Sequence, residues 1–515
     1  MLDLLIVIGY FVIIFVAAMR GRLREEVSTE QYFLSNRNLR WPSIALSTIA
    51  TNIQGYQFLG MMGSAYLYGI AQASLEINAV QGILIAAFIF VPLYLKDGVI
   101  TITQFISKRL GPKIGLAYSL ANLLLFSTIT LGAALFWGAY AAELVFSDYL
   151  SVLHEDRLKR IIILLIGLGV FSAIYTYFGG LSAVVRTDVI QFAILLTGGL
   201  IIVFIMIQKL GGWGMLYEKT PELMKLHLPA DHEKLPWTHM FGLFFLNINY
   251  WCANQSVMQR SLAAKNLREA QIGLMVGGVS KYLMAIVIVV PGIALAGLLG
   301  PDALKDPDMA FPTIVDTYLP TGLKGLILCA LFASLMSTVD STFNSLATLW
   351  SIDIYKKYLK PEATDREVVG AGKQTILVTL ITGILMGMVL LYLKFENPDA
   401  AFTHTLNELR YYINCGIVLL ICTAGFMLNA NRGMVLVTFL MTAYMNYTFT
   451  FLFPDMNYFV RAFWVIFIGL ALIASGQGRG GWRSPKEILQ SANPTNSYLG
   501  IGLLLSLILL HVVFH

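Results

Sequence analysis

Residues 47–69 read STIATNIQGYQFLGMMGSAYLYG, and this stretch decides the fold. The run is long enough to cross about 30 Å of hydrocarbon, yet amides and a glycine interrupt its middle. These residues are Asn52, Gln54, Gly55 and Gln57. A second run, FGLFFLNINYWCANQSVMQR at 241–260, is interrupted in the same way. Its amides are Asn247, Asn249, Asn254 and Gln255. Both stretches are predicted to be helices broken inside a membrane.

The composition places these stretches in a polytopic membrane protein. Of 515 residues, 57% are hydrophobic and 13% are charged, whereas about a quarter are charged in a soluble protein. Apolar runs predict about 14 transmembrane helices in an all-α fold, with 1–515 forming a single transmembrane domain. The runs lie near 2–19, 41–67, 75–97, 114–147, 159–178, 187–208, 238–259, 270–299, 322–352, 374–393, 404–428, 433–453, 458–476 and 496–514.

The distribution of basic residues predicts the orientation of the helices. Basic loops such as RGRLR at 20–24 and KKYLK at 356–360 lie inside if the N-terminus is outside. The C-terminus is then outside as well, and Lys281 and Arg410 are the cations expected within spans. A multi-pass protein of the plasma (inner) membrane is predicted. The net charge of +5 is spread over many loops and indicates no nucleic-acid partner.

The position of the two broken helices predicts how the core is organised. They are the second and seventh spans, five apart, which suits two inverted five-helix repeats. Broken helices at matching positions of two halves mark the binding site of a secondary transporter. Amides that only join neighbouring helices are the alternative.

A hydroxyl-rich helix supplies a candidate cation site. Residues 333–350 read ASLMSTVDSTFNSLATLW, and at 100° per residue most of their hydroxyls share one stripe. The stripe consists of Ser334, Thr338, Ser341, Ser345 and Thr348, with Ser337 at its edge. Hydroxyls alone can form contacts between neighbouring helices, but the adjacent carboxylate of Asp340 needs a bonding partner inside a membrane. Oxygen ligands favour sodium, and a proton on Asp340 is the competing interpretation.

Three further intramembrane charges are candidates for substrate binding. Glu76 and Lys281 either form a structural ion pair or contact a polyhydroxylated ligand together with Gln57 and Asn247. Tyr250 can add an aromatic face. Arg410 either reaches the headgroups or pairs with Glu408, or else it anchors a substrate carboxylate.

Four segments resemble the sodium/solute symporter family, in particular its sodium–glucose cotransporter branch. They are YFLSNRNLRWPSIALSTIATNI, FGGLSAVVRTDVIQ, YWCANQSVMQRSLAAKNLREAQ and ASLMSTVDSTFNSLATLWSIDIYKK. The resemblance covers about 32–358 and implies the leucine-transporter fold. Its ten-helix core would be 41–430, as repeats 41–210 and 238–430. An extra helix and linker precede it at 1–40, and three peripheral helices follow at 431–515.

The resemblance also implies which residues bind the ligands. A sodium site would consist of Ala50, Ile53, Ser334, Ser337 and Thr338. A second sodium site would consist of Asp188, Ser337, Asp340 and Ser341. The sugar site would consist of Gln57, Glu76, Asn247 and Lys281, with Tyr250 as inner gate and Asn407 replacing a glutamine of the tenth core helix.

Together these features predict a sodium-coupled symporter that imports a glucose- or galactose-like monosaccharide, or a related polyol, by alternating access. The alternative is a sodium- or proton-coupled symporter for a carboxylate, an amino acid or sialic acid. A channel or a substrate sensor on the same scaffold is a different class, disfavoured because no signalling domain and no repeated filter residues occur. An enzyme is the least favoured class, because no nucleophile–base or metal constellation is present in the sequence.

Overall fold

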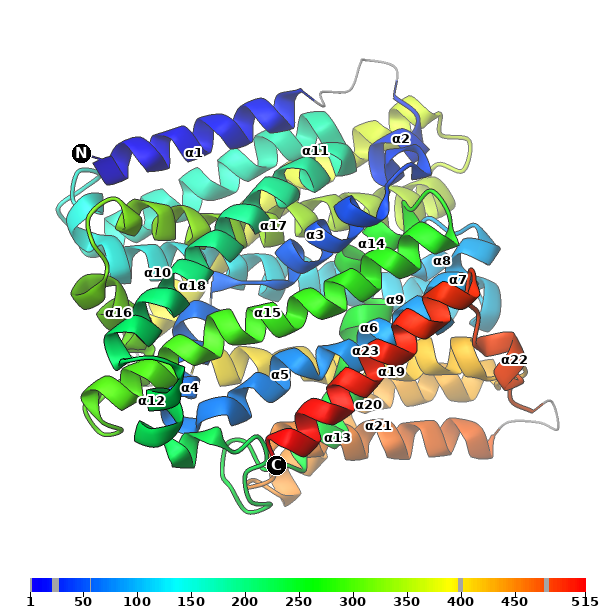
Figure 1. Cartoon of the computed structure of the whole chain (residues 1–515). Coiled ribbons are helices and arrows are strands. Elements are labelled where there is room, and N and C mark those ends of the chain that lie inside the picture. The colour runs from blue at the N-terminus through cyan, green and yellow to red at the C-terminus, as the bar shows by residue number, and fades with distance from the viewer. Residues whose placement is uncertain (1, 21–26, 56, 397–401, 477–480) are drawn as a thin grey trace.

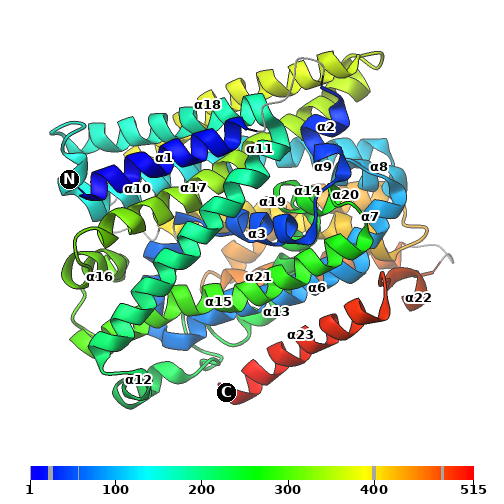
Figure 2. The same ribbon diagram turned by 45° about the horizontal axis from the view of Figure 1, so that its top comes forward.

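The computed structural model describes residues 2–20, 27–55, 57–396, 402–476 and 481–515, without the side chains at 402–405 and 407. The described residues form helices and contain no β-strand beyond three isolated bridges. Figures 1 and 2 show a bundle in which most helices run along a common direction. The all-α membrane fold predicted from the sequence is confirmed.

Within the described residues, eleven continuous helices are long and apolar enough to span a membrane. The difference from fourteen has a physical reason, because three predicted spans lie in broken or joined helices. The 54 residues of α11 (Arg157–Leu210) contain two predicted spans, and the continuous stretch Gln57–Asp97 contains the end of one span and the next one. The seventh predicted span is divided into pieces too short to count. The total of fourteen and the location of the termini stay predictions.

The first predicted break is present. Helix α3 (Trp41–Asn52) stops where Ile53 turns to an extended conformation, and the chain resumes as η2 (Gln57–Met61) and α4 (Met62–Tyr68). The Gln57 side chain accepts a hydrogen bond from the Gln54 N–H at 2.6 Å. Thr338 donates to the Thr51 carbonyl at 3.3 Å. Side chains therefore satisfy backbone groups that the break leaves without helical partners.

At the second break, side chains again form hydrogen bonds with the backbone groups that lack helical partners. Helix α13 (His239–Ile248) continues as the π-helical turn η7 (Asn249–Ala253), and α14 (Gln255–Leu262) follows after Asn254 leaves the helical conformation. Two buried tyrosines donate to the freed carbonyls: Tyr94 to Cys252 at 2.6 Å and Tyr118 to Ala253 at 2.5 Å. The Asn254 side chain caps the new helix by accepting from the Ser256 N–H.

A sharp bend at Gly180 separates the two halves of α11. Gly180 has φ of +53°, a conformation that side chains disfavour, and a Cβ there would lie 2.5 Å from the Tyr32 carbonyl oxygen. The Tyr32 hydroxyl donates to the carbonyls of Thr176 and Tyr177 just before the bend. The halves coincide with the predicted spans 159–178 and 187–208, so this glycine supplies the turn between them.

The hydroxyl-rich segment lies at the centre of the bundle as α17 (Leu323–Thr348), which continues into η9 (Leu349–Leu359). Almost every residue of α17 from Ile327 onward is buried. It packs against α3, α11, α1 (Leu2–Met19), α10 (Leu131–Leu150) and α18 (Asp365–Glu396). Its polar face is therefore buried inside the protein, which suits an ion site rather than a surface facing lipid.

Other helices complete the core and its margin. The core includes α15 (Leu267–Leu299), α19 (Phe402–Phe426) and the long helix formed by α9 (Pro112–Leu125), η5 (Phe126–Thr130) and α10. Helix α1 and the C-terminal α23 (Pro494–Val513) lie at opposite margins in both views (Figures 1 and 2), and α20 (Arg432–Leu452) and α21 (Tyr458–Ser475) flank α19. The shorter elements are α2 (Thr29–Leu34), η1 (Ser35–Arg37), η3 (Gly69–Ala73), α5 (Ser74–Ile77), α6 (Ala79–Ile85), η4 (Ala86–Phe90), α7 (Val91–Asp97), α8 (Ile102–Leu110), α12 (Trp213–Lys219), η6 (Pro221–Met224), η8 (Pro307–Met309), α16 (Ala310–Tyr318) and α22 (Pro485–Ile488).

The N-terminal helix caps the central helix. Helix α17 begins after Gly322, which has no side chain to bond the first-turn N–H groups. The buried Asp3 of α1 fills this role, since its Oδ1 accepts from the N–H of Gly322 at 2.9 Å and of Gly325 at 2.6 Å. A carboxylate at the positive end of a helix dipole is stabilising. Helix α1 thus fixes one end of the helix that carries the hydroxyl stripe.

We expect Asp3→Ala to lower the free energy of unfolding by about 1–2 kcal/mol, because the first turn of α17 loses its cap. Asp3→Asn keeps one acceptor oxygen and should lose less. Thermal unfolding of the purified protein in detergent measures both variants. Equal stability of Asp3→Ala and the wild type would contradict the capping role.

Candidate functional site: a cavity between the broken helices

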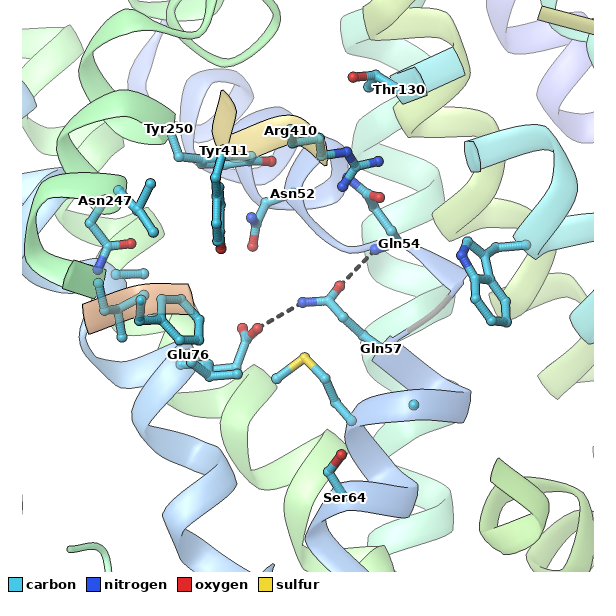
Figure 3. A pocket seen from close by; sticks show the side chains of 18 of the residues that line it. Asn52, Gln54, Gln57, Ser64, Glu76, Thr130, Asn247, Tyr250, Arg410 and Tyr411 are labelled. Carbon is cyan, nitrogen blue, oxygen red and sulfur yellow. Dashed lines mark hydrogen bonds between the residues drawn. The ribbon is translucent and has the colours of Figure 1, made fainter. Parts of the chain in front are cut away.

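A cavity of about 660 Å³ lies between the two broken helices. Five of the six predicted sugar-site residues line it together, and Figure 3 shows several of them facing the same space. These five are Gln57, Glu76, Asn247, Tyr250 and Lys281. The side chain of the sixth, Asn407, lies outside the described residues. The lining continues to Lys234, Lys305 and Lys394, which lie beyond the predicted spans at positions predicted to be outside.

Four side chains at the cavity form one hydrogen-bonded group. Gln57 on η2 donates to Glu76 Oε1 on α5 at 2.7 Å (Figure 3). Lys281, from the middle of α15, forms an ion pair with Glu76 and donates to Asn52 Oδ1 at 2.5 Å. The predicted ion pair of Glu76 and Lys281 is therefore present, and both residues line the cavity. The same residues can therefore offer fixed donors and acceptors to a ligand.

The second broken helix forms the opposite wall of the cavity. Asn247 donates from Nδ2 to the Asn78 carbonyl at 2.9 Å, which leaves its amide oxygen available to a ligand. Tyr250 belongs to the π-helical turn, is half-buried and lines the cavity. The indole of Trp251 packs closely on Gly82 of α6, where a Cβ would lie 2.7 Å away. Close packing thus fixes the segment that presents Asn247 and Tyr250.

The predicted sodium ligands lie on two helices that pack against each other, α3 and α17. Ala50 and Ile53 belong to the last turn of α3 and its end, where the carbonyls carry the negative end of the helix dipole. Thr338 bridges the two helices by donating to Thr51, and Thr51 and Thr338 both line the cavity. All five predicted ligands are buried. The Ser334 hydroxyl donates to the Leu331 carbonyl and the Ser337 hydroxyl to Asp188, and the sodium site stays a prediction.

Next to this position, Asp188 of α11 is bonded to a guanidinium. Arg260 of α14 lies 3.1 Å from Asp188 Oδ2, and neither side chain is exposed to solvent. Ser47 and Ser337 also donate to Asp188, while Ser341 accepts from Arg260. Three of the predicted second-sodium residues, Asp188, Ser337 and Ser341, are therefore joined in one network.

Asp340 lies beside this network with one oxygen still available. Its Oδ2 accepts from the Tyr175 hydroxyl of α11, whereas the buried Oδ1 has no hydrogen-bond partner among the described residues. Arg260 is bonded to Asp188 and not to Asp340, so among the described residues no cation is bonded to the carboxyl group of Asp340.

Sequence reasoning missed the burial of Arg260 and of Arg461. The positive-inside rule predicts Arg260 in an inner loop at the end of the second broken helix, but it is fully buried among α3, α11 and α17. Arg461 lies within the predicted span 458–476, so the expectation of only Lys281 and Arg410 inside spans is wrong. No local pattern marked the burial of Arg260, because its contact one turn back is to the backbone carbonyl of Ser256, which any residue at that position would supply.

Arg410 of α19 also lines the cavity. Glu408, its predicted neighbouring partner, forms an ion pair with Arg461 of α21 instead. Figure 3 shows the Arg410 side chain directed toward the broken segment that carries Asn52 and Gln54. The structure therefore favours the interpretation that Arg410 lies at the cavity over the interpretation that it pairs with Glu408.

Comparisons with known proteins agree with this geometry. The family model for the sodium:solute symporter family matches residues 32–396. The chain belongs to the sodium:solute symporter family. The resemblance seen in the sequence is thereby confirmed, and this symporter-family chain is a multi-pass membrane transporter rather than an enzyme.

Among relatives of this family member, a sodium/glucose cotransporter of Vibrio parahaemolyticus is 32% identical over 72% of this chain and 71% of its own length. Sodium/glucose cotransporter 1 of Sus scrofa is 31% identical over 73% of this chain and 62% of its length, so the match leaves more than a third of that relative uncovered. The solved substrate-bound, outward-open state of a sodium-coupled sialic acid symporter has a TM-score of 0.78 at 20% identity, covering 92% of this chain and 97% of that one. This likeness shows the leucine-transporter-type fold.

The pair of Glu76 and Lys281 gives a stability prediction. Lys281→Met leaves a buried carboxylate without its cation, and we expect a loss of about 3–5 kcal/mol in unfolding free energy. The double variant Glu76→Gln, Lys281→Met removes both charges and should recover most of this loss. Thermal unfolding of the single and double variants measures the coupling. Additive losses would contradict a direct ion pair.

Proposed function

We propose that this chain is a sodium-coupled symporter that imports a monosaccharide or related polyol by alternating access. Hydroxylated ligands require several fixed donors and acceptors, and Gln57, Glu76, Asn247 and Lys281 offer both kinds around one cavity. Tyr250 adds an aromatic surface at the inner part of the lining. The sodium/glucose cotransporters among the relatives support this substrate class.

One observation carries the coupling between ion and substrate: both proposed sites use the same interrupted helix. The carbonyl of Ile53 belongs to the sodium site, and Gln57, four residues later, belongs to the substrate site. Sodium bound between α3 and α17 would order the segment that positions Gln57. Each ligand then increases the affinity for the other, as thermodynamic linkage requires. Closure of the outer residues and movement of Tyr250 would release both ligands inward.

Uptake by proteoliposomes tests this function. With a panel of radiolabelled sugars, polyols and acids, we expect accumulation that requires an inward sodium gradient. Thr338→Ala should raise the half-saturating sodium concentration about tenfold by removing one ligand oxygen, and it should weaken apparent substrate affinity as well. Thr379→Ala removes a buried hydroxyl of α18 outside the site and serves as control. Uptake driven by a proton gradient and indifferent to sodium would refute the coupling.

We propose a second sodium beside Asp340. The Asp340 oxygen that has no hydrogen-bond partner among the described residues, next to the Asp188–Arg260 pair, would suit one monovalent cation. We expect two sodium ions per substrate in the wild type and one in Asp340→Asn, determined from reversal potentials in proteoliposomes. Asp316→Asn makes the same change at an exposed position and should keep the wild-type ratio. An unchanged ratio in Asp340→Asn would remove the second site and favour a proton at this carboxylate.

A further inference from the structure

The short helix α5, which carries Glu76, is held by two histidines from distant parts of the chain. A helix of four residues forms too few internal hydrogen bonds to hold its own position. His239 of α13 contacts its first residue, where the Ser74 Oγ and His239 Nε2 atoms are 3.1 Å apart. His511 of α23 contacts the residue after the helix, with its Nε2 3.1 Å from Asn78 Oδ1. The C-terminal helix therefore takes part in holding this wall of the cavity.

Asn78 connects His511 to the proposed substrate site. The Asn78 backbone carbonyl accepts the hydrogen bond from Asn247 Nδ2 at 2.9 Å, and its side-chain Nδ2 donates to the Ser74 carbonyl, also at 2.9 Å. A carbonyl can only accept, so the contact with Ser74 fixes which end of the Asn78 amide is the nitrogen. The amide oxygen therefore faces His511, and it also accepts from Gln81 at 2.7 Å.

The direction of these hydrogen bonds extends to a loop outside the spans. Because Asn78 Oδ1 accepts, His511 Nε2 carries the hydrogen, and Nδ1 of the neutral imidazole is an acceptor. His227 Nε2 lies 3.0 Å from His511 Nδ1, so His227 donates. The Leu226 N–H donates to the Phe514 carbonyl at 2.8 Å, which holds the same loop against the end of α23 (Figures 1 and 2). His227, His511 and Asn78 thus form a chain of hydrogen bonds, here named the histidine relay.

The histidine relay has no suitable place for a further proton. The Nδ1 atom of His227 is buried without a hydrogen-bond partner among the described residues, so a proton there would create an unpaired charge. A proton on His511 Nδ1 would occupy the lone pair that accepts from His227. Burial and the neighbouring imidazole of His515 lower the pKa of His227. The bonded relay thus binds fewer protons than separated histidines, whose pKa is about 6.5, and it weakens as the pH falls below that value.

Neighbouring groups do not compensate a positive charge on the relay. The carboxylates on adjacent elements are already paired, Glu76 of α5 with Lys281 and Glu222 of η6 with Lys225. The other titratable groups that act on the relay, among the described residues, are the imidazoles of His239 and His515. These imidazoles repel a positive charge when they are protonated themselves. Acid therefore acts against the relay from every side.

We propose that His227 and His511 are positioning residues of the substrate site: their relay holds Asn78, and Asn78 holds the Asn247 amide toward the cavity. This inference rests on the proposed function, because it concerns the affinity for the solute of that function. The Asn247 oxygen is presented to a ligand while its Nδ2 is bound to the Asn78 carbonyl. Loss of the relay loosens that carbonyl together with the end of α5. The affinity for the solute then decreases, and it decreases in acid as well.

Uptake kinetics test the relay. Proteoliposomes are given radiolabelled glucose, galactose or myo-inositol under an inward sodium gradient, with the same pH on both faces. We expect His227→Ala and His511→Ala each to raise KM about fivefold with little change in Vmax, the effect of one neutral hydrogen bond. The double variant should show the same fivefold change, because His227 acts through His511. His154→Ala changes a loop histidine bonded to Asp156 and serves as control. Multiplied effects in the double variant would overturn the relay.

Glutamine variants separate positioning from folding. A glutamine amide donates and accepts at the same time but does not titrate, so His227→Gln, His511→Gln can preserve the relay. We expect this double variant to keep the wild-type KM at pH 7.5. Between pH 7.5 and pH 5.5 the wild-type KM should rise about fivefold, whereas that of the glutamine variant should stay constant. An equal rise in both proteins would overturn the role of the two histidines.

Hydrogen–deuterium exchange tests the relay without any solute. With the full-length protein in detergent at pH 7.5, we expect faster exchange in α5 and in the first turns of α13 for His511→Ala, and wild-type exchange for the glutamine variant and for His154→Ala. Unchanged exchange in His511→Ala would overturn the inference. Sodium-driven uptake with an unchanged KM in His511→Ala would also overturn it and leave the symport function intact. Faster exchange in His511→Ala, without sodium-driven uptake of any of the three solutes by the wild type, would overturn the proposed function and retain the relay.

Discussion

A helix that stops inside a membrane leaves carbonyl and N–H groups that lipid cannot satisfy, and the rest of this structure depends on how those groups are satisfied. At the first break, the side chains of Gln57 and Thr338 bond backbone groups on either side. At the second break, Tyr94 and Tyr118 bond two successive carbonyls. The protein thereby retains the irregular backbone at its centre, and the carbonyls at the end of α3 remain available for a cation.

Several charges inside this protein are paired. Lys281 and Glu76 form a buried pair, and the buried Arg461 binds Glu408, whose side chain is 37% exposed. Arg260 and Asp188 form a further buried pair, and the neighbouring Asp340, bonded to Tyr175, lies beside the proposed sodium site. Burial of an ion is costly without compensation. Asp3 and Asp353 are buried without a bonded cation as well and are held by hydrogen bonds from α17 N–H groups and from Thr101, so a missing cation alone does not mark an ion site.

The sequence was informative wherever the signal was local. Amides inside apolar runs predicted both broken helices, and helical periodicity predicted the buried hydroxyl face of α17. The sequence could not decide whether Glu76 and Lys281 form an ion pair or contact a ligand, because 205 positions separate the two residues and no pattern joins them. The positive-inside rule predicts that an arginine at the end of a span lies exposed in a loop, and for Arg260 this prediction is wrong. Its burial depends on how α3, α11, α14 and α17 pack together, and no single stretch records that packing.

The five positions from Ile53 to Gln57 join the two proposed sites through a piece of chain that begins outside the helical conformation. A substitution in this linker is therefore expected to change both the selectivity for the solute and the strength of its coupling to the ion. The walls formed by α5 and α19 contain none of the proposed sodium ligands, whereas α15 also reaches the end of α3 through the bond from Lys281 to Asn52. Divergence toward new solutes, natural or engineered, can proceed on those walls while the driving ion is kept.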